Sequence, residues 1–119
     1  MPEPAVAAVE QQSNIVIIRA LVESFDEENV RRFQGEVRAA ADTNVGLPVV
    51  LDLAKVNFMP SMSLAALVRL VTEFRSRKQR LVLAGLQPQV REIFMLTRLD
   101  RLFELQDDVA AAVRAADFG

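Results

Sequence analysis

The sequence of 119 residues contains no cysteine, histidine, tryptophan or tyrosine. Without cysteine, the chain cannot form a disulfide, a thiolate zinc site or a cysteine nucleophile. Without histidine, it lacks the usual general base near neutral pH, the commonest metal ligand and the serine–histidine–aspartate arrangement. We therefore expect a protein that is not an enzyme, with no cofactor and no metal site.

The sequence also lacks the features of secreted, membrane-spanning and nucleic-acid-binding proteins. The first arginine is Arg19, so no basic region marks a secretory leader. The longest apolar stretches, 5–9 and 64–68, are far too short to cross a bilayer. A net charge of −2 is too near neutral for a protein held by phosphate contacts. We expect a cytoplasmic protein with no membrane insertion and no direct nucleic-acid contact.

What is present fits one domain over residues 1–119, with 51% hydrophobic and 25% charged residues. Runs of β-branched and apolar residues predict strands. These are 5–11, 14–21, 49–53, 81–86 and, more weakly, 102–105. Helical periodicity predicts helices between them and after the last one. Alternating strands and helices predict an α/β fold with a mixed, mostly parallel sheet of four to five strands and about four helices.

Polar residues before two of the helices predict where these begin. Ser24 and Glu27 form a capping-box pattern for the first helix, with Asp26 in its first turn. Ser61 is placed as the N-cap of a second helix over 62–78. At about 100° per residue, one face of that helix is predicted to meet the core and the opposite face to meet solvent. The core face would carry Leu64, Leu67, Val68 and Val71, and the outer face Met62, Ala66, Arg69 and Glu73.

Five short segments, in their order and spacing, resemble the STAS domain of bacterial anti-sigma-factor antagonists. They are Val-Val-Leu-Asp-Leu-Ala-Lys-Val-Asn-Phe-Met (49–59), Leu-Ala-Ala-Leu (64–67), Leu-Val-Leu-Ala-Gly-Leu (81–86), Val-Arg-Glu-Ile-Phe (90–94) and Leu-Asp-Arg-Leu-Phe (99–103). The resemblance implies an STAS-like fold and partner switching. In that mechanism the antagonist binds an anti-sigma factor that is itself a kinase, phosphorylation of the antagonist breaks the complex, and a phosphatase resets it.

The loop that carries the phosphoacceptor in this family departs from its pattern here. The family usually has Asp-Ser-Ser/Thr-Gly and then an apolar residue, whereas this chain has Pro-Ser-Met-Ser-Leu over 60–64. Met62 stands at the acceptor position, so the loop is degenerate and Ser61 and Ser63 are the remaining candidates. The family position of this loop and the helical angles of the second helix together predict a partner-binding surface on Met59, Pro60, Ser61, Met62, Ser63, Ala66 and Arg69.

Simpler interpretations stand beside these. Ser61 can serve only as a helix cap, Ser63 as a surface residue of the first turn, and Met62 as an exposed side chain without a partner. The Asp52 carboxylate is predicted to accept hydrogen bonds from loop amides. Two other functions also stay open: a STAS subunit of a signalling scaffold, or a transport-accessory domain with weak nucleotide or lipid-system binding. Association with a second copy of the chain, as a homo-oligomer, is a further open alternative.

Overall fold

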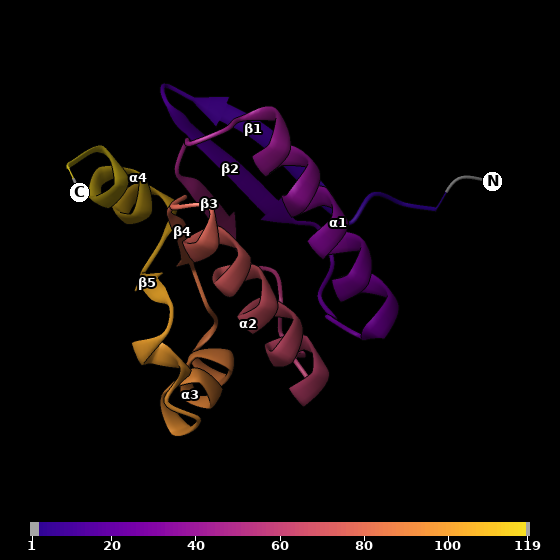
Figure 1. Cartoon of the computed structure of the whole chain (residues 1–119). Helices are drawn as coiled ribbons and strands as arrows, with labels where there is room; N and C mark the ends of the chain where they lie inside the picture. Colours follow the sequence, from indigo (N-terminus) through magenta and orange to yellow (C-terminus); the bar gives the residue numbers. More distant parts are fainter. Residues whose placement is uncertain (1–2, 119) are drawn as a thin grey trace.

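The computed structural model describes residues 3–118 as a five-stranded sheet with four α-helices and one 3₁₀ turn (Figure 1). The elements are β1 (Ala7–Gln12), β2 (Ile15–Ala20), α1 (Glu27–Thr43), β3 (Val49–Asp52), α2 (Ser61–Ser76), β4 (Leu81–Ala84), α3 (Pro88–Leu96), η1 (Leu99–Arg101), β5 (Glu104–Gln106) and α4 (Val109–Phe118). The strand order is β1-β2-β3-β4-β5; β1 runs antiparallel to β2, and all other neighbours are parallel. The predicted mixed, mostly parallel fold is confirmed.

The central strands explain the apolar runs in the sequence. Ile15, Val16, Ile17 and Ile18 of β2 are all buried, as are the first three residues of β3 and all four of β4. A parallel sheet covered on both faces needs apolar side chains on both faces, so these strands are continuously hydrophobic rather than alternating.

Helices cover the two faces unequally. The main core lies between the sheet and the side of α1, α2 and α3, and it includes Phe25, Phe33, Phe74 and Phe94. A smaller cluster on the other face packs Ile17, Val50 and Val82 against α4. In Figure 1, α1 and α2 lie side by side in front of the sheet, and both begin at the same end of the molecule.

The helix starts differ from the predicted caps. Asp26, not Ser24, caps α1, since its Oδ1 accepts a hydrogen bond from the Asn29 N–H at 2.9 Å. The second helix begins one residue earlier than predicted, with Ser61 as its first residue and extended Pro60 before it, and its side-chain cap is missing. The predicted N-cap role of Ser61 is therefore wrong. At the start of α4, Asp108 Oδ1 accepts a hydrogen bond from the Ala111 N–H at 2.8 Å, so an aspartate caps that helix as well.

Within residues 3–118, no helix combines the length and the apolar character needed to cross a membrane.

Candidate protein-docking site

The loop between β3 and α2 (residues 53–60) is held firmly at the carboxyl edge of the sheet. The Ala54 N–H donates to Asp52 Oδ1 at 3.1 Å, which confirms the predicted role of that carboxylate. Asp52 also lies 3.4 Å from the Arg19 guanidinium, so the carboxylate is held from two sides. On the far side, Gln87 Nε2 donates to the Ala54 carbonyl at 2.9 Å. The start of the loop is thus fixed to the strand before it and to the segment after β4.

The second half of the loop is fastened to the turn between β2 and α1. The N–H groups of Asn57 and Phe58 donate to the Glu23 carbonyl at 2.8 and 3.2 Å. In return, the Phe25 N–H donates to the Phe58 carbonyl at 2.9 Å. These backbone bonds form a short parallel bridge between Ser24 and Phe58, and they bring two segments more than thirty residues apart into one surface.

Three residues of the predicted partner-binding set lie inside the protein. Ser63 has no exposed surface, and its Oγ donates to the Phe25 carbonyl. Met59 is 5% exposed and Ala66 is 2% exposed, and both belong to the main core. The predictions that Ser63 lies on the surface and that Ala66 faces outward are wrong, and Ser63 is not accessible to a kinase in this structure.

The buried face of α2 is rotated from the predicted one because α1 packs along its side. Gln34 of α1 donates through Nε2 to the Ala66 carbonyl at 3.0 Å in a buried contact. Nearby, Arg38 of α1 makes two bonds to the Glu73 carboxylate, at 2.9 and 2.7 Å. The hydrogen bonds from Arg38 lower the pKa of Glu73 below its ordinary value. The helical periodicity of α2 alone does not show where α1 packs against it. The rotation of the buried face of α2 therefore could not be predicted from that periodicity.

The remaining predicted residues stay on the surface. Ser61, Met62 and Arg69 are exposed, and Pro60 is half-buried. The Met62 side chain is 42% exposed, in agreement with the prediction that it faces outward. Phe58 is 55% exposed and was missed by the sequence analysis, although an aromatic residue in a short loop between a buried strand and a helix was the available signal.

The first turn of α2 keeps its backbone donors free. It has no side-chain cap and no acidic residue, and within residues 3–118 no backbone acceptor is found for the N–H groups of Ser61 and Met62. A helix N-terminus of this kind favours negative charge through its exposed N–H groups and its dipole. A phosphate on the Ser61 hydroxyl would thus be tolerated by the fold.

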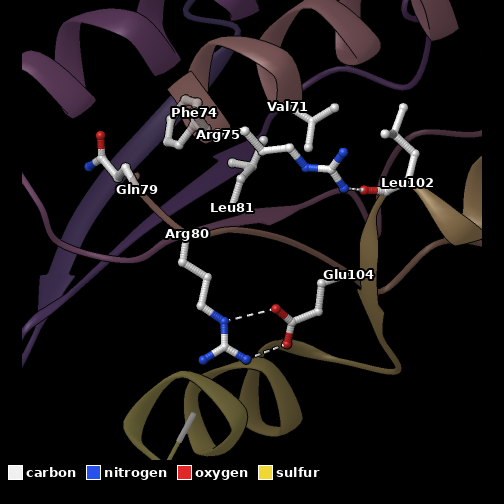
Figure 2. A pocket seen from close by; sticks show the side chains of 8 residues that line it. All are labelled: Val71, Phe74, Arg75, Gln79, Arg80, Leu81, Leu102 and Glu104. Carbon is white, nitrogen blue, oxygen red and sulfur yellow. Dashed lines mark hydrogen bonds and ion pairs between the residues drawn. The ribbon is translucent and has the colours of Figure 1, made fainter. Parts of the chain in front are cut away.

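A cavity of about 200 Å³ lies at the other end of α2 (Figure 2). Its polar side chains bond to other parts of the protein and hold the structure together. Arg80 holds Glu104 through two bonds of 2.8 and 2.6 Å, and these bonds lower the pKa of Glu104. Arg75 donates to the Leu102 carbonyl at 2.6 Å, and Gln79 donates to two backbone carbonyls ahead of β3. Each polar side chain that lines the cavity has a partner in the protein, so the cavity braces α2 against the β5 segment.

Three comparisons place this geometry among known proteins. The sequence profile of the STAS domain matches residues 6–112. BtrV of Bordetella bronchiseptica, named as a candidate anti-sigma factor antagonist, is 27% identical over 100 residues, which are 84% of this chain and 85% of BtrV.

Two solved structures share the fold. An anti-sigma-factor antagonist (STAS) domain protein from Planctomyces limnophilus superposes with a TM-score of 0.82 at 20% identity, over 96% of this chain and 99% of that one. SpoIIAA, a Bacillus cell fate determinant solved in its phosphorylated form, superposes with a TM-score of 0.67 at 19% identity, over 92% of this chain and 98% of that one.

Proposed function

The chain belongs to the STAS domain family, of the anti-sigma factor antagonist type, and we propose that it docks onto an anti-sigma factor kinase in the cytoplasm and thereby releases a sigma factor. Members of this type are regulatory proteins and not enzymes, in accord with the expectation from the missing histidine and cysteine. The docking surface is the start of α2 together with the loop before it: Phe58, Pro60, Ser61, Met62 and, about two turns further along the same face of the helix, Arg69.

One observation carries this proposal: two large apolar side chains, Phe58 and Met62, are exposed on backbone that is held rigidly. Exposed apolar groups on an ordered surface are typical of protein interfaces, where aromatic residues and methionine are enriched. Methionine adapts its shape to a partner, and Phe58 adds apolar area that a partner can cover.

The test is a binding measurement with an anti-sigma factor kinase of the same organism, using Met62→Glu. A carboxylate buried without a counter-ion in an apolar contact should weaken binding by at least about thirtyfold. Met95→Glu is the matched control. Met95 is 50% exposed on α3, so this substitution makes the same chemical change on a different part of the surface. Equal affinities for the wild type, Met62→Glu and Met95→Glu would reject the docking surface.

We further propose that the phosphoswitch of this chain, if the kinase retains one, acts on Ser61. Its hydroxyl is exposed beside Met62, whereas the Ser63 hydroxyl is buried and already bonded to Phe25. Mass spectrometry after incubation with the kinase and ATP should find phosphate on Ser61, and Ser61→Ala should abolish it. Phosphate on neither serine would mean that the chain binds constitutively.

A further inference from the structure

The docking surface has an acidic side, and we infer that its partner presents an apolar socket with an arginine- and lysine-rich rim to Phe58, Met62 and the start of α1. This inference rests on the proposed function and adds the chemistry of the partner and the route by which the two proteins meet.

The acidic side comes from the turn that is fastened to the loop. Glu23, Asp26, Glu27 and Glu28 account for four of the 16 acidic residues of the chain, and all four are exposed. The Glu23 carbonyl accepts both the Asn57 and Phe58 N–H groups, so the backbone that carries this glutamate lies beside the backbone that carries Phe58.

The first turn of α2 lies against the same segment. The Phe25 carbonyl, one residue before Asp26, accepts the Ser63 hydroxyl. Since α1 and α2 begin at the same end of the molecule (Figure 1), the segment that carries the four carboxylates lies beside the segment that carries Phe58 and Met62.

No cation of the described chain neutralises these carboxylates. Seven ion pairs occur within residues 3–118, and none of them includes Glu23, Asp26, Glu27 or Glu28. The nearest cations in the sequence are Arg19, which pairs with Glu10 and Asp52, and Arg31, which has no ion pair within residues 3–118. Asp26 caps α1, and Glu27 and Glu28 in its first turn interact favourably with the helix dipole, but all of these carboxylates are exposed and can also face a partner.

The sign of the charge selects among possible occupants. Nucleic acids and anionic lipid headgroups carry phosphates, which unpaired carboxylates repel. A second copy of this chain, docked through the same surface about a two-fold axis, would set its acidic side against this one. A protein whose socket is rimmed by Arg and Lys is attracted instead, and such attraction acts mainly on the rate of association.

The experiment measures association and dissociation rates with the anti-sigma factor kinase that tests the proposed function, at two salt concentrations. The variant is Glu27→Lys/Glu28→Lys, which leaves the Asp26 cap in place. Its control is Glu92→Lys/Asp117→Lys, which makes the same change of net charge at exposed positions on α3 and α4. Thermal unfolding of both variants verifies that each is folded.

We expect Glu27→Lys/Glu28→Lys to lower the association rate about tenfold at about 0.05 M salt, with little change in dissociation. The difference should shrink to about twofold or less at about 0.5 M salt, because ions screen charges beyond a few ångströms. Glu27→Gln/Glu28→Gln, which removes charge without reversing it, should give a smaller decrease of the same kind.

Association at the control's rate, or faster association for the lysine variant, would overturn the inference of a basic rim. The proposed function would survive that result if Met62→Glu still weakened binding relative to Met95→Glu. If the wild-type chain does not bind the kinase, the proposed function itself fails, and the two failures are thereby distinguished.

Discussion

A glutamate at Ser61 and a glutamate at Ser63 should change the stability of the protein in opposite directions, although the two positions are two residues apart. Ser61 is exposed at the uncapped start of α2, whose own first turn contains no acidic residue. A carboxylate there interacts favourably with the helix dipole and the free N–H groups, so Ser61→Glu should stabilise the fold by about 0.3–1 kcal/mol.

At Ser63 the same substitution meets a closed environment. The hydroxyl has no exposed surface and supplies the hydrogen bond to the Phe25 carbonyl. Its loss alone, as in Ser63→Ala, leaves a buried carbonyl unsatisfied and should cost about 1–3 kcal/mol. A buried carboxylate without a partner adds several kcal/mol, so Ser63→Glu should approach the entire stability of a typical domain, about 5–15 kcal/mol.

The assay is urea unfolding followed by far-UV circular dichroism, because a chain without tryptophan or tyrosine offers little intrinsic fluorescence. The expected order of unfolding midpoints is Ser61→Glu, wild type, Ser63→Ala and Ser63→Glu, from most to least stable. A midpoint for Ser63→Glu equal to that of the wild type would refute the buried position of Ser63. A loss of more than about 1 kcal/mol in Ser61→Glu would refute the account of the free helix start.

Two further predictions concern stability away from the docking surface. Because the hydrogen bonds from Arg80 lower the pKa of Glu104 below its ordinary 4.5, this pair stabilises the folded state at neutral pH and loses that effect as the pH falls through the lowered pKa. With both side chains about 30% exposed, Glu104→Gln should cost about 1 kcal/mol at neutral pH, and its urea midpoint should converge with that of the wild type once the pH falls below the lowered pKa of Glu104; a gap that persists in strong acid would contradict this. Gly85→Ala should destabilise by about 1–2 kcal/mol, because Gly85 has a φ of +76° and an added Cβ would lie 3.3 Å from the Ala54 Cβ. Gly35→Ala should have the opposite effect on stability, because Gly35 lies within α1 and nothing lies within 4 Å of the added Cβ. Thermal unfolding should show that this substitution raises the free energy of unfolding by about 0.5–1 kcal/mol.

The fold was predictable because its strands carry a strong local signal. Ile15-Val16-Ile17-Ile18 and Val49-Val50-Leu51 are too apolar for any place except a covered sheet, and these strands lie at its centre. The boundaries were less well predicted: the last strand is Glu104–Gln106 rather than 102–105, because η1 delays its start.

The site was predicted in place but not in detail, because its details depend on contacts between distant segments. The sequence does not distinguish Ser61 from Ser63 as a phosphoacceptor candidate. In the structure Ser63 is buried and donates to the Phe25 carbonyl, a contact with a segment far away in the sequence. The inward position of Ala66 requires the neighbouring Gln34 of α1. The backbone bonds that join Phe58 and Asn57 to Glu23 connect segments far apart in the sequence, so neither segment alone predicts them.

Those bonds between the Glu23–Phe25 turn and the loop at Asn57 and Phe58 also bear on the thermodynamics of recognition. The backbone that presents Phe58 and Met62 is ordered when the chain folds, so complex formation need not immobilise a flexible loop at that moment. Its entropy cost is then confined mainly to a few side-chain rotations and to the loss of overall tumbling. This surface acts as a pre-shaped element, and an exchange of partners can proceed without refolding of the chain.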